Sequence, residues 1–286
     1  MNLGDPNIKS IIEKKSLYSG WLISLALFIT ILVIYISSIK YTIFMNDGLF
    51  QYRAWNWVQY FIGFCSLATI GIRFKEVKVH TIICGVILGA LCWVSFFLWK
   101  KDMSTSVMNG VIAFLAFIAG CMLKSNENGI GSLMNEGNIK KAFKSFLWGS
   151  AISIPFATIN VVYFVVAEGP LKLQNPFVAA FFSLEPGISE EIIFRFFIIN
   201  AASAILRNKL SQKSLIFVVI FLAVVPHSII HYPDLWIKSL PSAIFMFFST
   251  SLLFGLPMTY IQYKKNLESA IGFHWFIDFI RFFAGF

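Results

Sequence analysis

Apolar stretches of membrane length recur along this chain of 286 residues and constrain its fold more than any other feature. A helix that crosses a bilayer needs about 20 mostly apolar residues. Hydrophobic residues make up 58% of the chain and charged residues only 13%. In soluble domains about 45–50% of the residues are apolar and about 25% are charged. The sequence therefore predicts an all-α fold, a polytopic transmembrane helical bundle.

The apolar runs divide the chain into about eight to nine candidate spans separated by short loops. The candidates lie near residues 18–39, 54–72, 79–98, 107–123, 142–167, 176–206, 214–231, 240–262 and 268–286. The longest polar linker, 124–141, follows the fourth candidate. We therefore expect two parts, with N-terminal spans and linker over 1–141 and a second helical bundle over 142–286.

The net charge of +9 does not indicate a nucleic-acid partner, because the basic residues lie in short loops between apolar runs. Cytoplasmic loops of membrane proteins carry an excess of lysine and arginine. With the N-terminus inside, fifteen of these residues, including Lys9, Lys14 and Lys15, fall on the inner side and six on the outer side. The charges predict an integral, multi-pass protein with a cytoplasmic N-terminus and the lipid bilayer as its surroundings.

The charged residues Glu190, Glu191 and Arg195 lie close together inside the apolar run 176–206. A charged side chain at the bilayer centre costs about 2.5–3.5 kcal/mol on insertion scales, and such residues mark functional sites. The run therefore predicts acid–base chemistry or the handling of protons or ions at membrane depth.

The same run is longer than a bilayer requires, and Glu185, Pro186 and Gly187 interrupt it. Proline removes a backbone donor and glycine loosens the turn, so the helix is expected to break or restart there. We expect an interfacial or re-entrant segment over 176–184 and a helix from about 187 to 206. Irregular backbone at membrane depth is tolerated where it lines a cavity, so a polar cavity is expected in the C-terminal half.

The spacing of the three charges separates two roles. Glu191 and Arg195 are four residues apart, so they share a helix face and can pair. Glu190 lies about 100° around the helix and is free to face a cavity and exchange protons. The alternative is an ion pair that only fixes helix packing, but such a pair needs one glutamate and not two.

Two histidines, His227 and His231, come after Pro226 and are likewise four residues apart. Metal ligands on a helix share this spacing, but the glutamate of the zinc-protease motif H-E-x-x-H is absent. His231 ends the predicted span and is expected to be interfacial or supporting. His227 lies deeper, and we expect it to be functional.

A third pair, His274 and Asp278, is again four residues apart, and Arg281 follows one turn later. A carboxylate often fixes the tautomer of a histidine. The alternative is a self-contained network of these three side chains that holds the last helix in place.

The order of these motifs resembles the CPBP family of intramembrane proteases, which includes the CAAX-processing type II endopeptidases and the bacteriocin-immunity (Abi) proteins. The resemblance covers roughly 176–286. The sequence departs from the family pattern at Ala223, where a phenylalanine is expected, and at Phe196, where glycine is common. The matching residues are Glu190, Glu191, Phe194 and Arg195 for the first motif, His227 for the second, and His274 and Asp278 for the third.

The resemblance implies an intramembrane endopeptidase in which Glu190 and His227 activate water. His274 and Asp278 would stabilise the oxyanion, with Asp278 orienting His274 or donating directly. The substrate would be a membrane-associated peptide or protein, with a lipidated one among the options, and the setting a prokaryotic plasma membrane. Supporting roles would fall to Glu191, Arg195 and His231.

The resemblance favours metal-independent glutamate chemistry with no cofactor. Zinc remains an alternative, and its ligands would be Glu190, His227 and His274, because tetrahedral zinc sites use such side chains.

Two other functions fit the same residues. Intramembrane glutamate, histidine and aspartate also form the proton relays of transporters. Transporters often have broken helices in two repeated halves, whereas this chain has one break and its polar residues crowd into the second half. A catalytically silent scaffold or immunity protein is the third alternative.

Overall fold

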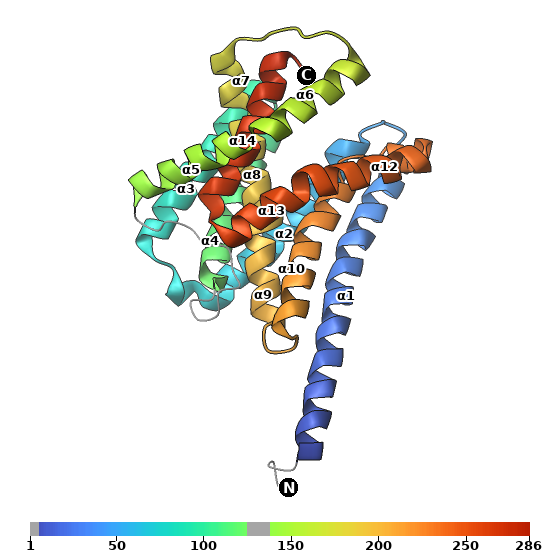
Figure 1. Ribbon diagram of the computed structural model, residues 1–286, viewed down its shortest axis with the longest axis vertical. Helices are drawn as coiled ribbons and strands as arrows, with labels where there is room; N and C mark the ends of the chain where they lie inside the picture. Colours follow the sequence, from blue (N-terminus) through green and yellow to red (C-terminus); the bar gives the residue numbers. More distant parts are fainter. Residues whose placement is uncertain (1–5, 125–137) are drawn as a thin grey trace.

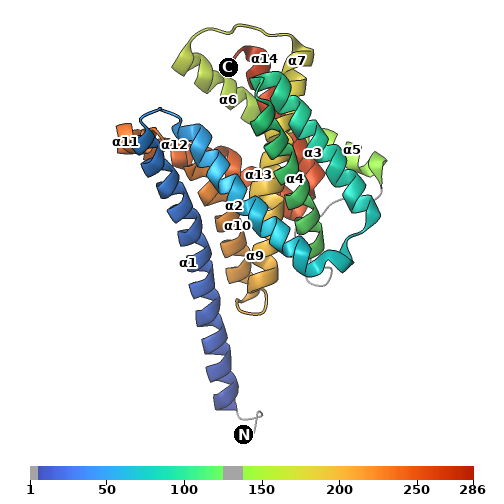
Figure 2. The same cartoon turned by 180° about the vertical axis from the view of Figure 1, so that it is seen from behind.

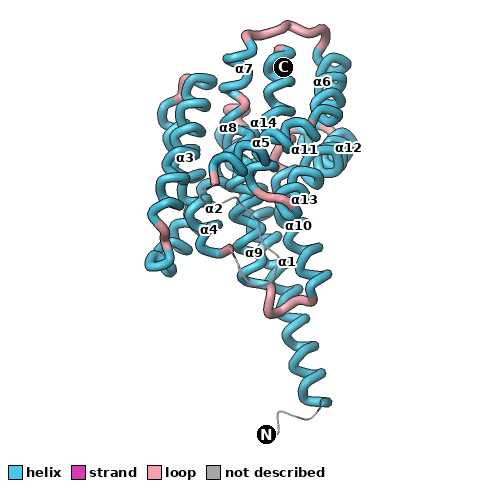
Figure 3. Tube along the Cα trace, turned by 60° about the vertical axis from the view of Figure 1, so that its left-hand side comes forward, coloured by secondary structure: helices cyan, strands magenta, loops and turns pink. Residues whose placement is uncertain are grey.

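The computed structural model describes residues 6–124 and 138–286, and within these ranges the regular structure is helical throughout (Figures 1 and 3). Side chains are described from residue 17 onward. The side chains of Lys9, Lys14 and Lys15 and most of the predicted linker 124–141 therefore lie outside the described residues.

The N-terminal part contains four long helices. They are α1 (Pro6–Met45), α2 (Phe50–Arg73) with the short 3₁₀ helix η1 (Phe74–Glu76), α3 (Val79–Lys100) and α4 (Met103–Leu123).

The C-terminal part consists of shorter, broken helices. They are α5 (Ile139–Ile152), α6 (Ile154–Glu168), α7 (Pro176–Phe182), α8 (Leu184–Glu190), the π-helix η2 (Glu191–Phe197), α9 (Ile198–Leu206), α10 (Gln212–Ile229), α11 (Leu235–Lys238), α12 (Leu240–Thr250), the π-helix η3 (Ser251–Gly255), α13 (Leu256–Lys264) and α14 (Leu267–Ala284).

Six helices in the described ranges are long and apolar enough to cross a membrane, or seven if the bent pair α5 and α6 counts as one span. The six are 17–45, 50–76, 79–100, 103–123, 212–229 and 240–264. The protein is thus an integral, multi-pass membrane protein, whereas the count of eight to nine spans and the orientation of the N-terminus stay predictions.

The predicted span 142–167 is two helices that meet at an angle of 48°. Ser153 separates α5 from α6, and Pro155 occupies the first turn of α6, where its missing N–H costs nothing. The candidate span is therefore bent at Ser153, and Pro155 was the available signal.

The predicted break lies earlier than expected. The chain turns at Ser183, between α7 and α8, and continues as helix from Leu184 through Leu206. Pro186 falls in the first turn of α8, where the backbone N–H groups have no partner within the helix, so it does not interrupt the helix. The expected start near 187 was therefore wrong by three residues.

Helix α14 occupies the centre of the C-terminal part and packs against α5, α6, α7, α8, α13 and η2 (Figure 1). Glycines allow its close approach to α5. A Cβ on Gly149 would collide with the carbonyl oxygen of Ser269, and one on Gly272 with that of Phe146. Ser150 Oγ donates to Gly272 O at 3.0 Å across the same contact. This contact fixes the depth at which α14 presents its side chains.

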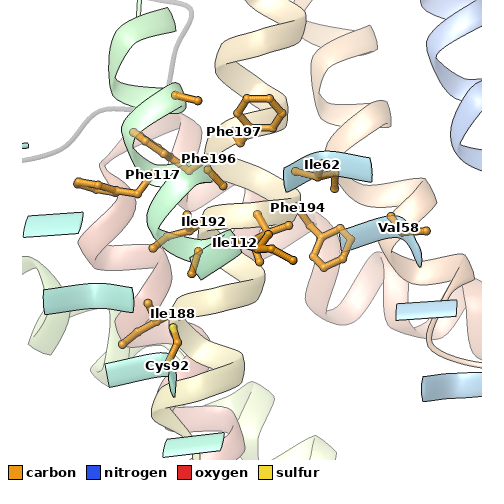
Figure 4. Packing of buried hydrophobic residues seen from close by; sticks show 14 of the residues in the cluster. Val58, Ile62, Cys92, Ile112, Phe117, Ile188, Ile192, Phe194, Phe196 and Phe197 are labelled. Atoms are coloured by element: carbon orange, nitrogen blue, oxygen red, sulfur yellow. The ribbon is translucent and has the colours of Figure 1, made fainter. Parts of the chain in front are cut away.

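Helix α1 lies at the edge of the bundle, and its N-terminal end extends well beyond the other helices (Figures 1 and 2). The helices α2 and α4, by contrast, pack on the π-helix η2. Figure 4 shows Phe194 of η2 beside Val58 and Ile62 of α2, and Phe196 beside Phe117 of α4. The N-terminal helices therefore hold the segment that carries the first motif, while the division at residue 141 stays a prediction.

Candidate active site

All seven residues of η2, including two charged ones, are buried. Glu191 is 0% and Arg195 1% exposed, and Arg195 Nη1 donates to Glu191 Oε1 at 2.5 Å. The predicted pair is therefore formed. Separating the two side chains would leave uncompensated charges in a low-dielectric interior, so the pair stays together.

Glu190 points elsewhere, as the helix geometry predicts. Its Oε2 lies 3.0 Å from His227 Nε2 and 3.7 Å from His274 Nε2. The side chain is 15% exposed, whereas that of Glu191 is 0% exposed. The two adjacent carboxylates thus differ in access: one faces open space and two imidazoles, and the other is enclosed.

Arg195 also reaches His227, a contact that the sequence did not indicate. Its Nη2 lies 3.1 Å from His227 Nδ1. A guanidinium has no acceptor, so Nδ1 accepts and the neutral imidazole carries its proton on Nε2. The ring of Phe194 stacks on that of His227 with centroids 4.6 Å apart, which further fixes its plane. His227 therefore presents an Nε2–H group to Glu190, although the 3.0 Å contact is not aligned as a hydrogen bond.

His274 connects both glutamates with the third motif. Its Nδ1 lies 2.8 Å from Glu191 Oε1, and its Nε2 lies 3.3 Å from Asp278 Oδ2. Arg281 Nη2 lies 2.8 Å from Asp278 Oδ1. With carboxylates on both sides, both nitrogens of protonated His274 can donate. Asp278, paired with Arg281, has the surroundings of an ionised orienting group.

His231 follows α10 and packs around His227. Its Nδ1 donates to the carbonyl oxygen of His227 at 2.8 Å, and the two rings lie 4.7 Å apart. Trp55 of α2 makes edge contacts with both rings, at 5.4 and 5.1 Å. The predicted residues from all three motifs therefore meet in one cluster.

One cluster in the described part of the chain has metal-ligand geometry. Ligand atoms of Glu190, His227 and His231 lie within 4.8 Å of one another. The predicted third ligand, His274, is not in this set. A metal-bound histidine usually donates its other N–H to an acceptor. His227 instead faces an arginine, so a metal at Nε2 would require both ring nitrogens to lack protons. The donor set therefore fits a metal poorly.

Two cavities meet at the cluster. The larger, of about 590 Å³, extends towards α2, α3 and α4, and the smaller, of about 130 Å³, towards α6, α10 and η3. Five ionisable side chains line both cavities: Glu190, His231, His274, Asp278 and Arg281. A volume of about 300–1,000 Å³ is typical of a ligand site, so the larger cavity can hold a substrate segment.

Several residues of the larger cavity were not predicted to belong to the site. Glu185 of α8 is buried on its wall, and Asn56, Gln59 and Asn109 add amide groups from α2 and α4. Buried amides in otherwise apolar helices were the available signal. The N-terminal helices therefore contribute directly to the surroundings of the site.

The fold and this cluster define a class: multi-pass helical membrane proteins with a buried glutamate–histidine–aspartate site. Residues 172–280 match the family described as type II CAAX prenyl endopeptidase, Rce1-like. The match includes every predicted site residue and confirms the resemblance to the CAAX-processing proteases. A search of the curated proteins and a search of the solved structures each returned no significant match.

Proposed function

We propose that the protein is an intramembrane endopeptidase in which Glu190 is the general base that activates water. One observation carries this proposal. Among the carboxyl groups of the three motifs, only Glu190 lacks an arginine partner, and it faces both cavities and the Nε2 atoms of two imidazoles.

The reaction follows from the hydrogen-bond directions. Glu190 takes a proton from water, and the water oxygen attacks the scissile carbonyl carbon. The Nε2–H of His227, which Arg195 fixes by binding Nδ1, is available to hold the attacking water beside Glu190. The proton on Glu190 then passes to the departing nitrogen, and the C–N bond breaks.

The developing oxyanion requires donors in a site with little water. His274 is the donor that we assign. Glu191 accepts from its Nδ1–H and orients the ring, so the Nε2–H, which lies near Asp278 and Glu190, can donate to the oxyanion. Glu191 and Arg195 act through the two histidines and are positioning residues. The donor set at His227 favours a mechanism without metal, and we propose that the site works without a cofactor.

The substrate is proposed to be a peptide segment, since the family is one of proteases. The larger cavity takes this segment, and its aromatic and amide lining suits a peptide backbone with apolar side chains. A lipidated substrate is proposed on the same basis, the match to this family.

The test is the cleavage of a panel of fluorogenic membrane peptides, prenylated ones included, by purified wild type and by Glu190→Gln. We expect Glu190→Gln to lower kcat by about 10²–10⁴-fold, the usual contribution of a general base. The matched control is Glu168→Gln at the exposed end of α6, which should cleave at the wild-type rate.

The same assay with a chelator separates the two chemistries. Cleavage that persists in chelator supports the glutamate mechanism, and cleavage that is abolished by chelator and restored by zinc overturns it. Absence of cleavage together with solute uptake driven by a pH gradient in proteoliposomes would favour the transporter instead.

A further inference from the structure

Glu185 is a buried carboxyl group for which the proposed reaction has no use. It lies on α8, is 6% exposed and lines the larger cavity with Glu190. Its Oε1 accepts a hydrogen bond from Ser189 Oγ at 2.7 Å and a long one from Asn109 Nδ2 at 3.5 Å. Both donors are neutral.

Each of the other carboxyl groups around the cluster has a cationic or imidazole partner. Glu191 has Arg195, Asp278 has Arg281, and Glu190 has His227. Within the described residues, Glu185 has no ion-pair partner. Lys100 and His274 on the cavity wall interact with the Glu185 charge only through space, without a contact within 4 Å. The lysine and arginine side chains of the wall have nearer neighbours. Lys100 Nζ lies 3.7 Å from the centre of the Trp99 ring, and Arg281 pairs with Asp278.

A buried carboxyl group without a countercharge favours the protonated form, and a ligand that brings a cation stabilises the carboxylate. We propose that Glu185 is a specificity-determining residue that binds a lysine or arginine side chain of the peptide substrate in the larger cavity. This inference rests on the proposed function, because it assumes a peptide in that cavity.

The walls of the cavity suit such a side chain. Trp55, Phe96 and Trp99 offer aromatic surface. Lysine and arginine bury their methylene stems on apolar surface while the charged end meets a polar partner, and arginine also stacks on aromatic rings. Asn109 and Ser189 can remain bonded to Oε1 while the ligand approaches Oε2.

The position of the basic residue follows from helix geometry. Glu185 and Glu190 are five residues apart on α8, which is about 7.5 Å along the axis. An extended peptide advances about 3.3–3.6 Å per residue. For an extended peptide that runs parallel to α8, the basic residue therefore lies about two residues from the scissile bond.

The experiment measures peptide binding to the Glu190→Gln variant, so that cleavage does not interfere. Tryptophan fluorescence reports binding, because Trp55 and Trp99 line the cavity. The peptides are acetylated at the amino terminus and differ at one position only: lysine, acetyl-lysine or norleucine. We expect lysine to bind at least about tenfold more tightly than acetyl-lysine, which corresponds to about 1.4 kcal/mol.

Adding Glu185→Gln should bring this ratio close to one, since glutamine keeps the shape and can accept from Ser189 but lacks the charge. Glu168→Gln, an exposed change of the same kind, should leave the ratio unaltered. Equal binding of lysine and acetyl-lysine peptides, or a preference that survives Glu185→Gln, would overturn the proposal. The comparison of lysine with acetyl-lysine peptides needs no change at Glu185. It therefore tests the proposal even if Glu185→Gln does not fold.

Peptides with a free amino terminus and norleucine form a further arm. A preference that follows the free amino group and not the side chain overturns the assignment to lysine and arginine.

Cleavage by wild type separates the two proposals. Cleavage without a lysine preference overturns the Glu185 subsite alone, whereas lysine-selective binding without cleavage overturns the peptidase and supports the subsite.

Discussion

The outermost helix and the central π-helix reverse the usual relation between polarity and burial. In the most apolar stretch of α1 the mean hydropathy is 2.6, yet only 22% of the residues are buried inside the protein. Every residue of η2 is buried, although two of its seven residues are charged. In a bilayer, apolar side chains can face lipid without cost, so burial does not select for them. The buried positions of η2 are instead those that bring the charged side chains of the site together.

Substitutions should therefore matter more on η2 and α14 than on α1. On α1, side chains face the apolar surroundings and have few neighbours to lose. On η2 and α14, each polar side chain contacts the next motif, so a change at one position alters the others.

Arg195→Met should have the largest effect on stability. It leaves Glu191 as a buried charge without its main partner, which typically costs about 3–5 kcal/mol in the free energy of unfolding. Denaturant titration of the protein in detergent measures this. The double variant Glu191→Leu/Arg195→Met should recover most of the stability and none of the activity. A single variant as stable as wild type would show that the central network contributes nothing to the fold.

Gly272→Ala should come second, because the new methyl group collides with the carbonyl oxygen of Phe146. Overpacking of this kind costs about 1–3 kcal/mol, and the displacement of α14 should also slow cleavage. The matched control is Gly71→Ala in α2, where a Cβ has no atom within 4 Å. Equal stability of the two variants in the same titration would contradict the close α5–α14 contact.

Asp102→Ala should have a smaller effect, because it removes a helix cap between α3 and α4. The Asp102 side chain accepts from the backbone N–H groups of Ser104 and Thr105. Such caps contribute about 1 kcal/mol. The hydrogen bond from Thr105 holds the pKa of Asp102 below its usual range. The folded state thus favours the ionised form, so the contribution is present at neutral pH and is lost as the pH falls through that lowered pKa.

The check is the stability difference between wild type and Asp102→Ala at pH 7 and below about pH 3, where aspartate in unfolded chains is largely protonated. The difference should shrink at the lower pH. A difference independent of pH would mean that the carboxylate charge is not what caps α4.

Leu25→Ala on α1 should have the smallest effect. Leu25 is 53% exposed within the protein, so the change removes few contacts. Surface substitutions usually stay within about ±0.5 kcal/mol. A loss of more than about 1 kcal/mol in the same titration would indicate a partner on this face and would break the contrast with η2.

Local spacing allowed the pairs within each helix to be predicted. Glu191 with Arg195 and His274 with Asp278 follow from the repeat of the α-helix, as does the separate direction of Glu190. Contacts between helices, such as Arg195 with His227 and Glu191 with His274, depend on crossing angles and depths that one sequence does not encode locally. The bend at Ser153 was not predicted, and the break at Ser183 was placed too late, because proline in a first helical turn permits a helix instead of ending it.

The measurement that tests the central claim most directly compares the two adjacent glutamates. Single-turnover cleavage and unfolding in detergent are measured side by side for Glu190→Gln and Glu191→Gln. The account predicts that Glu190→Gln keeps nearly wild-type stability and loses cleavage, while Glu191→Gln loses stability and keeps part of its cleavage. Full cleavage by Glu190→Gln, or a stable but inactive Glu191→Gln, would contradict the division of roles between the two carboxylates.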